Sequence, residues 1–95
     1  MSINILSQDG NTLINYNNVA SLYIKKEYMQ YSHPSTWWEI IAMYSSASSG
    51  TALYNVIARF ENEQNCKSVF RRMLNLICEQ KENFISINEL IKQEF

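Results

Sequence analysis

The spacing of the apolar residues changes near Glu61, and this change constrains the fold more than any other feature. Before Glu61 apolar side chains tend to alternate with polar ones, which is the period of a strand. After it they recur at i, i+3, i+4, i+7, i+10 and i+11, in the order Cys66, Val69, Phe70, Met73, Leu76 and Ile77. This stripe predicts a long amphipathic helix. Asn62 is a suitable N-cap for it, and Glu61 and Glu63 place negative charge near its start.

The N-terminal residues 3–16 predict a β-hairpin. Asp9-Gly10 lies between two short apolar segments and predicts a type I′ turn, because both positions of that turn need positive φ. Three asparagines predict a second turn, since Asn tolerates the left-handed region: Asn15, Asn17 and Asn18.

Three further strands are predicted at residues 19–26, 37–46 and 51–60. In the first, Ala20, Leu22 and Ile24 share one face. The second is largely apolar on both faces, which indicates a strand that is central or has a partner on its second face: Trp38, Ile40, Ala42 and Tyr44 on one side, and Trp37, Glu39, Ile41 and Met43 on the other. In the third we expect Tyr54, Val56, Ala58 and Phe60 to point inward and Asn55 and Arg59 outward. Residues 27–36 predict the longest loop or a mobile hairpin tip, and residues 45–50 a connector of small side chains.

The predicted fold is a single α+β domain spanning residues 1–95. About five strands form one curved antiparallel sheet, and the long helix packs across its open face, as in pleckstrin-homology-like barrels. Ser86-Ile87-Asn88-Glu89 matches a capping box and predicts a short terminal helix through Phe95.

Charge and cysteine content narrow the functional classes. Eight Lys and Arg against nine Asp and Glu give a formal charge of -1, so no global attraction to nucleic acid or anionic membrane is expected. We expect no secretory signal and no membrane span. Cys66 and Cys78 lie twelve positions apart on one predicted helix, about 18 Å along its axis, too far to pair with each other. Free thiols are typical of a cytoplasmic protein.

Two segments carry a resemblance. Residues 5–19, which begin Ile-Leu-Ser-Gln-Asp-Gly-Asn, and residues 58–70, which begin Ala-Arg-Phe-Glu-Asn-Glu, resemble a group of small uncharacterised proteins of Gram-positive bacteria and their phages. Those proteins similarly begin with a Ser-Gln-Asp hairpin, continue as a sheet and end in a helix. The resemblance implies this fold and an origin in a phage or mobile element, and it implies no catalytic or binding residue.

The sequence offers few groups for catalysis. His33 is the only histidine, and a Cys-His pair would have to join it to Cys66 or Cys78 across the fold. We expect both thiols to be buried in the helix instead, because free Cys is among the most buried residue types. One histidine and two distant cysteines predict no zinc site, the two glycines form no phosphate loop, and Asp9 is explained by its turn. We therefore expect neither an enzyme nor a cofactor.

Aromatic and basic residues of strands three and four predict an interaction surface. On the outer sheet face, Tyr23, Lys25, Lys26, Tyr28, Tyr31 and Trp37 could stack nucleic-acid bases, with Arg71 and Arg72 adding charge from the helix. Tyr28, Met29, Tyr31 and Trp37, with Ile41 and Met43, fit a protein interface better, because hot spots are enriched in Trp, Tyr and Arg. Trp37 could also lie in the core, and a homodimer could bury it together with Ile41 and Met43.

The sequence thus predicts a non-enzymatic module that binds a protein partner or a second copy of itself. Its expected binding residues are Lys25, Lys26, Tyr28, Met29, Tyr31 and Trp37. A nucleic-acid-associated protein is the alternative.

Overall fold

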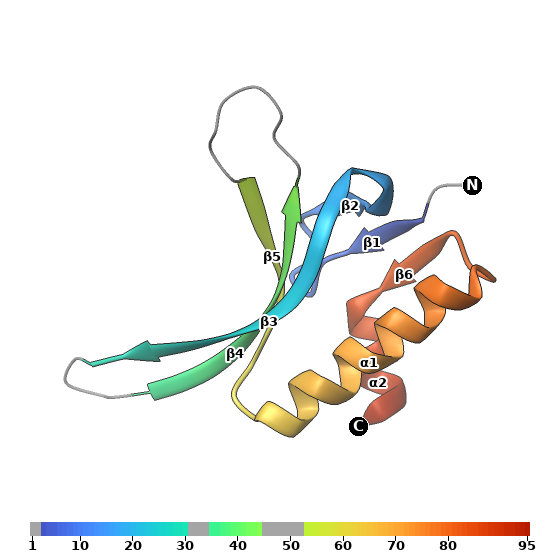
Figure 1. Cartoon of the computed structure of the whole chain (residues 1–95). Coiled ribbons are helices and arrows are strands. Elements are labelled where there is room, and N and C mark those ends of the chain that lie inside the picture. The colour runs from blue at the N-terminus through green and yellow to red at the C-terminus, as the bar shows by residue number, and fades with distance from the viewer. Residues whose placement is uncertain (1–2, 31–34, 45–52) are drawn as a thin grey trace.

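Two three-stranded sheets and two helices make up the fold (Figure 1). The computed structural model describes residues 3–30, 35–44 and 53–95. In chain order the elements are β1 (Asn4–Leu6), β2 (Leu13–Asn15), a 3-10 turn (Tyr16–Asn18), β3 (Val19–Met29), β4 (Ser35–Tyr44), β5 (Leu53–Phe60), α1 (Glu63–Glu79), β6 (Phe84–Ser86) and α2 (Ile87–Glu94). The α+β class is confirmed.

The prediction of one five-stranded antiparallel sheet is wrong. The strand order is β2-β1-β6 in one sheet and β3-β4-β5 in the other, and neither closes into a barrel. The β1–β2 hairpin is present, with Ile5 opposite Ile14. However, β1 also pairs in parallel with β6, a strand eighty positions later that the sequence did not predict. This pairing draws the hairpin into its own small sheet.

The β1–β2 connection is a six-residue loop, and the predicted type I′ turn is wrong. Only Gly10 has positive φ, at 75°, whereas that turn needs two such residues. Asp9 organises the loop instead: its carboxylate accepts hydrogen bonds from the Ser7 hydroxyl and from the Asn11 backbone N–H. These bonds hold the pKa of Asp9 below its usual value, because they stabilise the charged form. The second predicted turn is confirmed, and the Asn15 side chain accepts from the Asn17 N–H there.

The β3–β4 hairpin projects as an arm from the rest of the molecule (Figure 1). Of the two predictions for residues 27–36, the long loop is wrong and the hairpin is confirmed, because β3 continues to Met29 and pairs antiparallel with β4, which begins at Ser35. β4 is the central strand, one of the two arrangements that its apolar faces indicate. β5 ends at Phe60, opposite Trp38. Beyond that point, residues 27–29 and 35–37 form a ribbon of only two strands, which we call the arm.

The core lies between the inner face of β3-β4-β5, one face of β2-β1-β6, and the apolar sides of both helices. α1 contributes the predicted stripe, with Cys66, Val69 and Met73 fully buried. The Asn62 side chain caps α1 by accepting from the Asn65 N–H at 3.1 Å. α2 begins after Ser86 as predicted, but the Ser86 side chain makes no capping hydrogen bond. In the described parts of the chain, no helix is long and apolar enough to cross a membrane.

A β-bulge reverses the predicted orientation of half of β5. Ile40 pairs with Ala58 and the next residue of β4, Ile41, pairs with Val56, so Ile57 is the extra residue of the bulge. Ala58 and Phe60 point inward as expected. Upstream of the bulge the alternation is shifted by one residue, and Tyr54 and Val56 therefore point outward. The prediction of their inward orientation is wrong.

Gln8 covers part of the free edge of β5 with its backbone and its side chain. The Gln8 backbone N–H donates to the Ile57 carbonyl at 2.8 Å, and the Gln8 side-chain oxygen accepts from the Arg59 backbone N–H at 2.8 Å. The Gln8 carbonyl in turn accepts from the Asn88 side chain of α2. Gln8 thus joins the loop of one sheet to the edge of the other and to α2.

Candidate functional site

Apart from the Met29–Ser35 pair at the end of the arm, four rows of side chains cross the outer face, by which we mean the face of β3-β4-β5 turned away from α1. Residues directly opposite each other in neighbouring strands share a face, so the register defines each row. The rows are Glu27–Trp37, Lys25–Glu39–Arg59, Tyr23–Ile41–Val56 and Ser21–Met43–Tyr54. The first two rows are mainly charged and the last two mainly apolar.

The charged rows carry two positive and two negative groups. Lys25 Nζ lies 2.9 Å from Glu27 Oε1, and this contact raises the pKa of Lys25. The Arg59 guanidinium carbon lies 4.0 Å from the centre of the Trp37 ring, a cation–π distance. Trp37 is half-buried and outside the core cluster, so its place is the outer face. Its indole nitrogen is buried and has no acceptor among the described residues.

The apolar rows form what we call the outer patch: Tyr23, Ile41, Met43, Tyr54 and Val56. Ile41 at its centre is only 2% exposed, whereas Tyr54 at its edge is 59% exposed. The core cluster on the inner side includes residues of both helices and of the other sheet, and it includes none of the outer-patch residues. Residues 45–52, between β4 and β5, contain no side chain larger than Thr. An apolar surface of this kind is typical of a binding site.

The structure divides the predicted site residues between two faces. Lys25, Met29 and Trp37 belong to the outer face, where Lys25 lies opposite Glu39. Lys26 and Tyr28 alternate with them and lie on the opposite face, so their predicted position on the outer face is wrong. Tyr31 and His33 lie outside the described residues.

Three of the predicted residues nevertheless come together at the end of the arm. Tyr28, Met29 and Trp37 line one shallow depression with Gln30. Tyr28 is 56% exposed, and no described element covers it. The arm therefore presents aromatic and methionine side chains to solvent on both of its faces.

The basic residues proposed for nucleic acid do not form one surface. Lys25 lies on the outer face beside Glu27, while the Lys26 ammonium lies 5.9 Å from the centre of the Trp38 ring on the other face. Arg71 and Arg72 lie on α1 and line a separate depression with Glu94 of α2.

The thiols differ in their surroundings. Cys66 is fully buried as predicted, and burial, with a smaller contribution from the charge of Glu63, raises its pKa to about 11. Cys78 is exposed, so the prediction that it is buried is wrong. Neither forms a disulfide. Within residues 3–30, 35–44 and 53–95, no group of three or more His, Cys, Asp or Glu side chains is placed to hold a metal ion.

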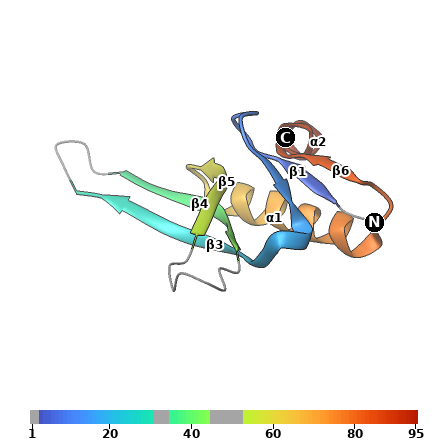
Figure 2. The same cartoon turned by 90° about the horizontal axis from the view of Figure 1, so that it is seen from above.

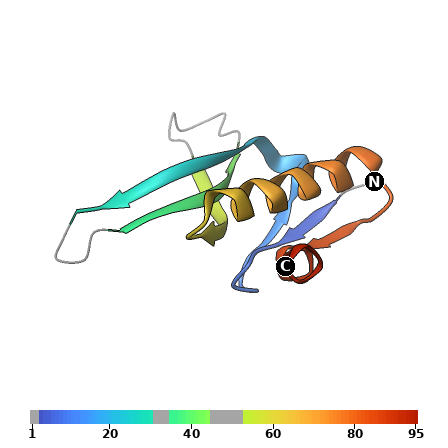
Figure 3. The same ribbon diagram turned by 90° about the horizontal axis from the view of Figure 1, so that it is seen from below.

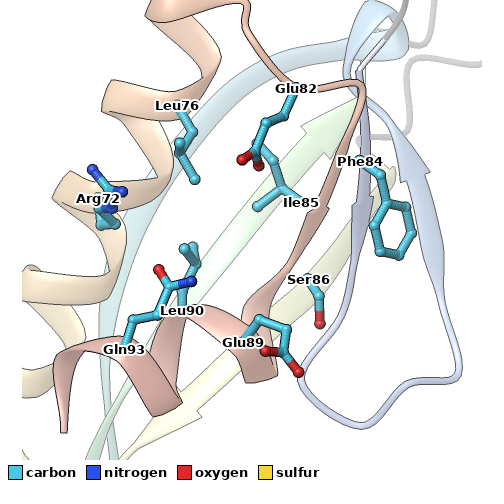
Figure 4. A pocket seen from close by; sticks show the side chains of 9 residues that line it. All are labelled: Arg72, Leu76, Glu82, Phe84, Ile85, Ser86, Glu89, Leu90 and Gln93. Carbon is cyan, nitrogen blue, oxygen red and sulfur yellow. The ribbon is translucent and has the colours of Figure 1, made fainter.

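A groove of about 260 Å³ lies where α1, β6 and α2 meet (Figure 4). Its floor is formed by the buried side chains of Leu76, Ile85 and Leu90. Polar groups surround this floor: Arg72, Glu82, Ser86, Glu89 and Gln93. Phe84 of β6 completes the lining, and Figure 4 shows it beside that strand. One guanidinium among two carboxylates offers no concentrated charge, and the floor belongs to the core.

Sequence reasoning missed Tyr54 and Val56 as surface residues, because a one-residue bulge leaves no trace in the apolar pattern. It also overlooked a signal that was present. Along β3, Lys26 and Tyr28 alternate with Lys25 and with Glu27, the residue opposite Trp37. Strand alternation alone therefore places Lys26 and Tyr28 on the other face. Comparison of the chain with known protein families, with curated proteins and with solved structures gave no match.

Proposed function

We propose that this chain is a non-enzymatic protein-interaction module that binds its partner through the outer patch. One observation carries the proposal: the outer patch lies outside the core cluster, and Tyr54 and Val56 within it are exposed. The outer patch combines two tyrosines with Met43, Val56 and the buried Ile41. Aromatic residues and methionine are enriched at the cores of protein interfaces.

The charges beside the outer patch favour a protein over a nucleic acid. Lys25, Glu27, Glu39 and Arg59 sum to zero, and Lys25 already contacts Glu27. Nucleic-acid binding requires several cations that follow a phosphate backbone. The other proposed cations, Lys26 and Arg72, lie on different surfaces.

The state of Cys66 supports a non-enzymatic role. A nucleophilic cysteine needs a lowered pKa and access to its substrate. Cys66 has a raised pKa and is buried under the helix. Glu63, which the sequence placed near the helix start, lies in the first turn of α1 and pairs with Lys67 at 3.7 Å, a structural arrangement that needs no catalytic explanation.

The test is affinity capture from a lysate of the source organism with tagged chain, read by mass spectrometry. Tyr54→Glu places a charge in the outer patch, and we expect it to abolish retention of a protein that the unsubstituted chain retains. Leu13→Glu is the matched control, because Leu13 is 58% exposed but belongs to the other sheet. Thermal midpoints of both variants verify that the fold is intact.

Equal retention by the Tyr54 and Leu13 variants contradicts the proposal. Loss of the retained material after nuclease treatment of the lysate also contradicts the proposal, and it favours the nucleic-acid alternative. The resemblance to phage proteins adds the proposal of an accessory role in a phage or mobile element, and the identity of the retained protein tests it.

A further inference from the structure

β3 exposes a long free edge. It has eleven residues and, among the described strands, pairs only with β4; Figures 2 and 3 both show it as the outermost strand of its sheet. The opposite edge strand, β5, is partly covered by Gln8. An open edge presents unpaired backbone N–H and C=O groups, to which another strand can add.

We propose that β3 binds the β3 of a second copy of this chain, antiparallel, with the two-fold axis at Lys26. The proposal goes beyond the function argued above, because it uses the edge of the sheet; of the outer patch it involves Tyr23 alone. The two sheets become one continuous sheet of six strands.

Charge complementarity selects a second copy as the occupant. An axis at Lys26 places Lys25 of each copy opposite Glu27 of the other, on the outer face. Lys25 and Glu27 already contact each other within one strand at 2.9 Å, so the four side chains alternate in sign around the axis. Opposite charges in directly facing positions stabilise a strand pair. Lys26 of one copy lies opposite Lys26 of the other, and the repulsion between the two charges weakens the association. Each Lys26 lies over the ring of Trp38 in its own chain.

Neighbouring registers lack this complementarity. An axis at Lys25 places Lys25 opposite Lys25 and Glu27 opposite Tyr23. An axis at Glu27 places Glu27 opposite Glu27 and Lys25 opposite Met29. Like charges facing each other destabilise the pair, and neither register forms a single opposite-charge contact across the outer face.

The same register covers the apolar side chains of the arm. Met29 of one copy lies opposite Tyr23 of the other, and Tyr28 lies opposite Ile24. Tyr28 and Met29 are the exposed large hydrophobic residues of β3. A two-stranded ribbon is marginally stable in water, and residues 27–29 gain a third strand from the other copy.

Sedimentation velocity of the full chain over a range of concentrations tests the association. We expect a monomer–dimer equilibrium that Lys25→Glu and Glu27→Lys each weaken about tenfold, because both cross-strand pairs become repulsive. The double variant with both substitutions restores the association. Lys67→Glu is the matched control, since it breaks a comparable exposed pair with Glu63 on α1 and leaves the dimer unchanged.

Disulfide trapping tests the register. In a Cys78→Ser background, Lys26→Cys places two thiols opposite each other at the axis, within about 5.5 Å between Cα atoms, which a disulfide can span. We expect oxidation to give a covalent dimer with Lys26→Cys and none with Ser21→Cys. A chain that sediments as a monomer throughout, or equal trapping at both positions, overturns the proposal. The capture experiment with Tyr54→Glu tests the outer patch, and its outcome does not depend on the sedimentation or trapping results.

Discussion

Gln8 joins three elements of the fold: the β1–β2 loop, the edge of β5 and α2. It lies in the β1–β2 loop, yet it supplies both a donor and an acceptor to the edge of β5. A neighbouring strand would normally supply these groups. The Asp9-centred loop holds Gln8 in place, because Ser7 and Asn11 both bond the Asp9 carboxylate.

Gln8→Ala removes the acceptor of the Arg59 backbone N–H. We expect the free energy of unfolding to fall by about 1 kcal/mol, since the donor loses its partner at a partly covered edge. Hydrogen exchange of the Arg59 amide should accelerate in the folded protein. Gln8→Glu keeps an acceptor at the same position and should retain most of the protection. Unchanged exchange in the alanine variant contradicts this role.

Cys66 makes stability depend on alkaline pH. Its pKa is about 11 in the folded protein and 9.0 when unperturbed, because burial disfavours the thiolate. The unfolded chain therefore loses this proton first as the pH rises. The stability that the buried thiol contributes is complete below pH 9 and is lost between pH 9 and about 11.

Urea unfolding across this pH range measures the effect. Cys66→Ala should show a smaller decrease in unfolding free energy than the unsubstituted chain, although it is less stable at every pH. Cys78→Ala, which removes the exposed thiol, should keep the full decrease. Parallel pH profiles for the unsubstituted chain and Cys66→Ala would exclude Cys66 as the source.

The bulge in β5 is the element that determines which residues reach the outer patch. Without Ile57 as the extra residue, Val56 and Ala58 would share the inner face. We expect Val56→Lys to cost about 1 kcal/mol or less, whereas Ala58→Lys, at a 2% exposed position, should cost more than about 3 kcal/mol. Thermal denaturation of both variants measures the difference. Equal losses would indicate an uninterrupted strand.

α1 shows what a sequence pattern can predict. Its stripe repeats over about three turns, from Cys66 to Ile77, and each repeat adds independent support for one buried face. The apolar faces of β4 indicated either a central strand or a strand with a partner on its second face, and only the strand order decides between them.

The partition into two sheets was not predictable in this way. Alternation indicates that a segment is a strand, but it does not identify the neighbouring strand. β6 has only three residues, too few to show a period, and its partner β1 lies eighty positions earlier. The sequence signal for β6 was limited to two adjacent apolar residues, Phe84 and Ile85.

For the same reasons, the faces on which the predicted site residues lie were predictable only in part. Alternation places Lys25 and Trp37 on one face, and it would also have separated Lys26 from them. The bulge hid Tyr54 and Val56, which only the three-dimensional register reveals.

The molecule as a whole is more extended than a chain of its size requires. Its Cα radius of gyration is 14.0 Å, against about 12 Å for a compact domain of this length. The arm accounts for the excess (Figure 1). Small-angle scattering extrapolated to zero concentration should give a radius close to 14 Å, and the radius should rise with concentration as dimers form. A concentration-independent value near 12 Å would mean that the arm folds back on the body.

The covered edge of β5 has a consequence for assembly size. A sheet with two open edges can add copies at both, and growth then has no natural end. Here Gln8 occupies the groups of Ile57 and Arg59 that a further strand would need. Gln8 therefore blocks strand addition at this part of β5, while the edge of β3 stays available for the pairing proposed above.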